Sequence, residues 1–186
     1  ANIWTSGNVG LTTDLHGAHD MGDNAIGWVV GNDGRVVKVS QGGLAYYVIP
    51  DIPKETLYDI VFLSDTTGFI VGKMGTVLKT TDSGASWTKL SINGLTNETL
   101  YSVDASGDNV AIAGDKILIV SEDAGVTWDV QSLAGTLNIF RDVFFESSTS
   151  ILAVGTDYDV KSIVYKYDLT PKVSGADANL ILTPEP

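Results

Sequence analysis

The chain has 186 residues, of which 44% are hydrophobic, and a mean hydropathy of +0.14, which is enough apolar material for one substantial packed domain and argues against disorder. The net charge of −12 argues against nucleic acid and anionic membranes as partners, because both require a basic face. The chain has no cysteine, which excludes disulfides, thiolate metal sites and cysteine nucleophiles, and no apolar stretch long enough to suggest direct membrane insertion.

The N-terminal residues are predicted to form one isolated strand. Residues 3–15 carry a Trp-Thr pair followed by Leu-Thr, and they resemble residues 87–98 in the middle of the chain. The later segment is predicted to be the last strand of a repeated unit and the linker after it. Residues 1–14 are therefore predicted to supply a last strand without the three strands that precede it in the other units.

Four repeated units follow, at about residues 15–55, 56–98, 99–137 and 138–170. The segment 57–72 has relatives at 100–114 and 140–155 and a more diverged one at 16–31, so the repeat interval is 40 to 43 residues. Apolar and β-branched runs separated by Gly-rich turns predict four short strands per unit, A to D, with strand B ending in glycine. We predict a single domain over 1–170, followed by a tail over 171–186.

The turn between strands C and D carries a phrase that occurs twice: TTDSGASW at 80–87 and SEDAGVTW at 121–128. The Asp carboxylate can accept hydrogen bonds from turn N–H groups, the Gly can adopt a positive φ, and the Trp offers a large apolar surface to a neighbouring unit. A structural role is therefore favoured over a ligand contact for these residues, which are Thr80, Asp82, Gly84, Trp87, Ser121, Asp123, Gly125 and Trp128.

The phrase resembles the Asp-box, or bacterial neuraminidase repeat, and the longer frame resembles the propellers of photosystem II assembly factors. Four strands in about 40–45 residues is the size of one β-propeller blade. The predicted fold is therefore all-β: a small propeller of four, alternatively five, four-stranded blades, with the N-terminal strand closing the last one. An open array closed by a second chain is a further alternative. In the tail, Leu180, Ile181 and Leu182 are predicted to add a strand within the ring or to a neighbouring molecule.

No catalytic constellation is found. Sialidases, the best-known enzymes with Asp-boxes, clamp a carboxylate with three arginines, whereas this chain has only Arg35 and Arg141. His16 and His19 are three residues apart on a predicted strand, so they should point to opposite faces and not chelate one ion. We predict that the protein is not an enzyme.

Two clusters are candidate binding sites. The third positions of the A strands are predicted to line a channel in which Asp59 and Asp142 face each other and could share a cation; they align with Ala18 and Ser102. The loops between strands B and C are predicted to form an acidic binding face, with Tyr158 as an exposed aromatic contact. The face comprises Asp33, Asp115, Asp157, Tyr158 and Asp159.

These observations predict a non-enzymatic propeller for protein–protein association or structural assembly, placed outside the cell, on a cell surface or on a virion. The partner would be a protein, including the chain itself as a homo-oligomer or filament. A carbohydrate- or ligand-binding module that uses the B–C face is the first alternative, and an assembly factor for a membrane protein complex is the second. No cofactor is expected, with calcium or another cation as the alternative.

Overall fold

The computed structural model describes residues 12–22, 26–40, 43–47, 54–132, 139–157 and 161–169. These residues form β-strands joined by turns and one 3-10 turn, η2 (Asn32–Gly34), so the all-β prediction is confirmed. Within the same ranges no helix has the length and apolarity needed to cross a membrane. The segments 1–11 and 170–186, which hold the predicted closing strand and tail, including Leu180, Ile181 and Leu182, lie outside the described residues.

The strands form four antiparallel sheets in chain order. The first contains β1 (Leu15–Asp20), β2 (Ile26–Gly31), β3 (Arg35–Ser40) and β4 (Gly43–Tyr47); the second contains β5 (Leu57–Phe62), β6 (Gly68–Gly72), β7 (Val77–Thr80) and β8 (Thr88–Lys89). The third contains β9 (Leu100–Ser106), β10 (Asn109–Gly114), β11 (Ile117–Ser121) and β12 (Asp129–Ser132). The fourth has β13 (Ile139–Ser147), β14 (Ser150–Thr156) and β15 (Ser162–Asp168).

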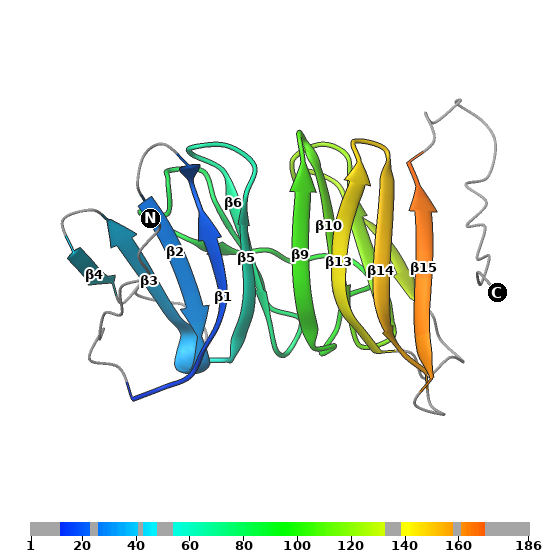
Figure 1. The fold of residues 1–186 in the computed structure, drawn as a ribbon, viewed down its shortest axis with the longest axis horizontal. Helices are drawn as coiled ribbons and strands as arrows, with labels where there is room; N and C mark the ends of the chain where they lie inside the picture. Colours follow the sequence, from blue (N-terminus) through cyan, green and yellow to red (C-terminus); the bar gives the residue numbers. More distant parts are fainter. Residues whose placement is uncertain are drawn as a thin grey trace, which may run out of the picture.

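The sheets are arranged as an open arc around their first strands. Strand β1 packs beside β5, β5 beside β9, and β9 beside β13, and we call these four the inner strands. The first and fourth sheets lie at opposite ends of the row (Figure 1). A closed four-bladed ring would place β13 beside β1, and the described strands do not do so. The core clusters lie between successive sheets, so these sheets pack face to face.

Burial along the strands reflects this arrangement. Strand β11, with the sequence ILIVS, is buried along its whole length because its sheet is covered on both faces. Strand β15, with the sequence SIVYKYD, alternates between exposed and partly buried residues, as expected where one face of the sheet is open. The cores lie between neighbouring sheets; the largest fully buried side chains include Phe69, Phe140, Leu57, Ile70, Leu78, Leu100, Ile112, Ile117 and Ile119.

A glycine lies at the end of strand B in the first three sheets and one residue before its end in the fourth, because the chain passes too close for a side chain. A Cβ at Gly114 would lie 2.4 Å from the carbonyl oxygen of Thr99, just before β9. The same clash, at 2.0 to 2.4 Å, arises at Gly31, Gly72 and Gly155. The residue after each of the first three glycines then donates a backbone hydrogen bond to the same carbonyl; the bond from Asp115 to Thr99 measures 2.9 Å.

Each inner strand also carries a β-bulge near its start, at the second residue of β1, β5 and β9 and at the third residue of β13. The pairing with strand B shifts between Leu57 and Asp59, and equivalent shifts follow Leu15, Leu100 and, between Phe140 and Asp142, the fourth inner strand. This register corrects the sequence alignment of the first unit, which begins at Leu15 and not at His16. Gly17, and not Ala18, is therefore the counterpart of Asp59.

The two Asp-box turns have nearly identical hydrogen bonds. In the first, Thr80 Oγ1 accepts from the Gly84 N–H at 3.0 Å and donates to Asp82 Oδ1 at 2.7 Å, while Asp82 Oδ1 also accepts from the Ser86 N–H at 2.9 Å. The second turn repeats these bonds through Ser121, Asp123, Gly125 and Thr127. Hydrogen bonds from the neighbouring Ser or Thr side chain and backbone lower the pKa of Asp82 and of Asp123 to about 2.

These lowered pKa values predict an acid-sensitive contribution to stability. The unfolded carboxyls titrate near pH 3.9, so the contribution is present above about pH 4 and is lost as the pH falls towards about 2. The double variant Asp82→Asn/Asp123→Asn should therefore lose less unfolding free energy between pH 5 and pH 2.5 than the parent chain, as measured by urea titration. Asp65→Asn, on the exposed β5–β6 loop, removes one carboxylate without touching either turn and is the control. A pH profile unchanged in the double variant would contradict the prediction.

Candidate functional site

Carboxylates tie the inner strands together across neighbouring sheets. Asp59 on β5 accepts the backbone N–H of Val103 on β9 at 2.9 Å through Oδ2, and its own neighbour Ile60 donates to Oδ1 at 2.9 Å. Asp104 on β9 accepts the N–H of Phe145 on β13 at 2.8 Å. These bonds occupy inner-strand N–H groups that no sheet ladder reaches, and we call them the inner joints.

Asp142 belongs to the same system of bonds. The Ser102 hydroxyl donates to Asp142 Oδ1 at 2.8 Å, and the Val143 N–H donates to the same oxygen at 3.0 Å. Burial raises the pKa of Asp59, and the charge of Asp142 adds to the rise, whereas the bonds from Val103, Ile60 and Ser102 oppose it.

A cation shared by Asp59 and Asp142 in a channel stays a prediction, and the structure places both acids beside β9. They lie on the strands either side of β9 and bond to β9 or to their own backbone. At the first joint Gly17 replaces the acid: a Cβ there would lie 2.6 Å from the Cα of Asp59, so β1 and β5 approach directly. Among the described residues, no three His, Asp or Glu side chains gather into a metal site.

The four bulge residues form a continuous stack at one end of the inner strands. The ring of His16 lies 5.3 Å from that of Tyr58, and Tyr58 lies 5.3 Å from Tyr101. The guanidinium carbon of Arg141 lies 4.4 Å from the centre of the Tyr101 ring, a cation–π contact. Each sheet contributes one side chain, and we call the four the loop-end row because they lie beside the B–C loops.

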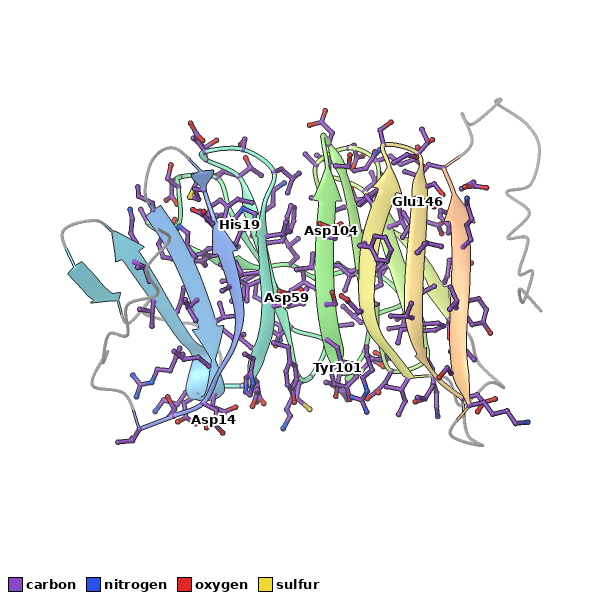
Figure 2. The ribbon with its side chains drawn as sticks, viewed as in Figure 1. Asp14, His19, Asp59, Tyr101, Asp104 and Glu146 are labelled. Carbon is purple, nitrogen blue, oxygen red and sulfur yellow. The ribbon has the colours of Figure 1, made fainter. Side chains whose placement is uncertain are left out.

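Polar groups flank this row. His16 Nε2 lies 2.9 Å from Asn32 Oδ1, and the Asn32 amide donates to Asp14 at 3.4 Å. Burial raises the pKa of Tyr101, the Asp115 carboxylate raises it further, and Arg141 acts in the opposite direction. Tyr101 and Asp14 lie at the lower end of the inner strands in Figure 2, whereas His19, Asp104 and Glu146 lie towards the upper end.

The model of the photosynthesis system II assembly factor YCF48 family matches residues 47–139, half of the chain. The chain belongs to this family. The resemblance to photosystem II assembly-factor propellers is thereby confirmed. No curated protein sequence matches the chain.

Solved structures show the same fold at low sequence identity. YCF48 from Cyanidioschyzon merolae is 16% identical with a TM-score of 0.65, and the match covers 92% of this chain and 56% of that one. A structure described as YCF48 bound to D1 peptide is 21% identical with a TM-score of 0.56, covering 64% and 39%. The computationally designed Ika4 protein is 15% identical with a TM-score of 0.62, covering 84% and 93%. The chain thus spans about two fifths to just over half of the two YCF48 chains.

The predicted B–C face is only partly assembled as expected. Asp33, Asp115 and Asp157 lie in B–C loops, and Asp157 Oδ1 accepts the N–H of Lys161 at 2.8 Å, whereas Tyr158 and Asp159 lie outside the described residues. Exposed lysines share these loops, so the described part of the face is not uniformly acidic; they are Lys73, Lys116 and Lys161.

The loop-end row was not predicted from the sequence. The comparison of repeats used the positions of Asp59 and Asp142, whereas the row is made of the bulged residues just before Gly17, Asp59, Ser102 and Asp142, which are His16, Tyr58, Tyr101 and Arg141. His16 and His19 lie towards opposite ends of β1, and both rings contact β5: His19 lies 5.8 Å from the ring of Phe62, and His16 contacts Tyr58. Burial lowers the pKa of His19, while the charges of Asp20 and Asp104 oppose that shift.

Proposed function

We propose that the chain is a non-enzymatic association module that binds an extended segment of a partner protein during assembly of a membrane protein complex. Membership of the YCF48 family supports an assembly role, and one solved relative is described as bound to D1 peptide. This is the second alternative of the sequence analysis. No comparison supports the extracellular or virion setting, the glycan or the homo-oligomer.

The loop-end row carries the proposal. Every sheet contributes one side chain to this row. Its three rings and one guanidinium contact one another in sequence across the four inner strands. Aromatic and arginine side chains dominate the binding energy of protein interfaces. A stacked guanidinium also keeps N–H groups along its edge to pair with a carboxylate or with peptide carbonyls.

The absence of an enzymatic role is part of the same proposal. The sialidase clamp cannot be assembled from Arg35 and Arg141, and Arg141 is stacked on Tyr101. The inner carboxylates that resemble an acid pair are engaged with backbone N–H groups and the Ser102 hydroxyl. The site therefore offers contacts for recognition and no activated nucleophile.

The test measures binding of a synthetic D1 peptide by fluorescence polarisation. Tyr101→Ala and Arg141→Ala should each weaken binding by about tenfold or more, because each removes an anchor from the stack. Val126→Ala is the control: this side chain is 75% exposed on the Asp-box turn at the opposite end of the sheets and should leave affinity unchanged. No peptide binding by the parent chain, or equal affinity in all three variants, would overturn the proposal.

A further inference from the structure

The inference concerns the two tyrosines at the centre of the loop-end row. Tyr58 on β5 and Tyr101 on β9 are the bulged residues of neighbouring inner strands. Their ring centres lie 5.3 Å apart, and the ring planes are inclined at 49°. Aromatic rings at this separation are in contact. Carbon atoms of the two phenol rings therefore lie next to each other across the boundary between the second and third sheets.

The surroundings of the two rings keep them at this spacing. Asp59 accepts the N–H of Val103 at 2.9 Å, so a hydrogen bond joins β5 and β9 beside the pair. On the outer sides of the pair, the His16 ring lies 5.3 Å from one tyrosine ring, and the Arg141 guanidinium carbon lies 4.4 Å from the centre of the other. Both tyrosines are partly buried. A small solute can therefore reach them from solvent while they remain in contact with each other.

A proton acceptor lies beside each phenol. Burial raises the pKa of Tyr101 and the nearby Asp115 carboxylate raises it further, and Asp115 Oδ1 is buried with no hydrogen-bond partner among the described residues. On the other side of the pair, His16 Nε2 lies 2.9 Å from Asn32 Oδ1, and the Asn32 amide donates to Asp14. Because that oxygen can only accept, the neutral imidazole carries its proton on Nε2 and has a basic Nδ1. Each phenol can therefore pass its proton to a base when it loses an electron.

We propose that Tyr58 and Tyr101 form a modification site at which a one-electron oxidant joins their rings as dityrosine. Each phenol gives one electron to the oxidant and one proton to a neighbouring base, and it becomes a neutral phenoxyl radical. The two radicals form a carbon–carbon bond between the ring positions next to the hydroxyl groups. The hydrogen on each of these carbons then moves to the phenol oxygen, which restores both aromatic rings. The protein thus loses two hydrogen atoms in all.

The crosslink ties the second sheet to the third by a covalent bond. In the chain without it, these sheets are held by side-chain packing and by hydrogen bonds such as that from Val103 to Asp59. The inference does not rest on the proposed function, because the two rings react with an oxidant and need no bound segment. Failure of the chain to bind a peptide would therefore leave it standing.

The test treats the folded full chain, at low concentration, with visible light, tris(bipyridine)ruthenium and persulfate, which takes up the two electrons as it splits into two sulfate ions. Intact-mass spectrometry should show a monomer that has lost two hydrogen atoms, and digestion should place the link between residues 58 and 101. Tyr58→Phe and Tyr101→Phe each keep a ring in the stack and should abolish this product. Tyr165→Phe is the control: Tyr165 is also partly buried, its ring lies 5.1 Å from that of Phe140, and the change should leave the yield unaltered.

Unfolding separates the effect of the fold from the reactivity of tyrosine itself. The same treatment in concentrated urea should lower the yield of this crosslink by about tenfold or more, because the rings are no longer held together. The proposal is overturned if the folded and unfolded chains give equal yields, or if the folded monomer forms no link between residues 58 and 101. It is also overturned if either Tyr58→Phe or Tyr101→Phe retains the product.

Discussion

Replacing Phe69 with alanine should destabilise the protein by about 4 kcal/mol, the usual cost of deleting a fully buried phenylalanine. Phe69 is 0% exposed and lies at the joint between the second and third sheets, where it contacts Gly125 and Trp128 and lies 5.5 Å from Lys79 Nζ. Its loss leaves a cavity under the Asp-box turn and removes the ring over which Lys79 is held. The measurement is the free energy of unfolding from urea titration.

Phe144→Ala is the matched control for this prediction. Phe144 on β13 is 43% exposed, so the same truncation should cost no more than about 1 kcal/mol. Equal losses in the two variants would mean that the fourth sheet is covered in solution, and a small loss in both would mean that the second joint contributes little. Either result would contradict the packing described above.

Gly114→Ala should cost about 3 kcal/mol, because a single methyl group has no room where β10 meets the start of β9. The added Cβ would lie 2.4 Å from the Thr99 carbonyl oxygen and 3.0 Å from a Leu100 methyl carbon, and the first of these atoms belongs to the backbone. The steric clash is relieved only if the two strands move apart, and this movement breaks the hydrogen bond from Asp115 to Thr99.

Gly27→Ala tests whether this cost is specific to the strand end. Gly27 also lies in a strand B, but a Cβ there would have its first neighbour at 3.5 Å, an ordinary contact. The change should therefore alter the free energy of unfolding by less than about 0.5 kcal/mol. Thermal unfolding of the two variants side by side gives the comparison, and similar melting temperatures would rule out the steric explanation.

The repeat and its strands could be predicted from the sequence because each strand and turn is indicated by residues that are adjacent in the chain. Runs such as ILIV at 117–120, followed by an Asp-x-Gly turn and a Trp, indicate a strand, a reversal and a second strand without reference to the rest of the chain. Closure is not local. It depends on the angle between packed sheets, which is set by the volumes of side chains on facing strands, and the repeat length carries no record of that angle.

The candidate site was harder to predict for a related reason. A strict alternation of faces would place the third residue of each A strand in a channel, but the bulge breaks the alternation. It places the bulged residue of each A strand in the loop-end row and turns Asp59 towards β9. His, Tyr, Tyr and Arg also do not share one chemical class, so the row becomes visible only when the four sheets are placed side by side.

The inner joints constrain their two sides unequally. Each has a carboxylate on one strand and a backbone N–H on the next, at Val103 for Asp59 and at Phe145 for Asp104. For the hydrogen bond itself the donating residue needs only an N–H, which proline alone lacks. The side chains at 103 and 145 are constrained by packing instead, since Val103 is buried in a core cluster and Phe145 packs against another, whereas the acids at 59 and 104 are required by the bond.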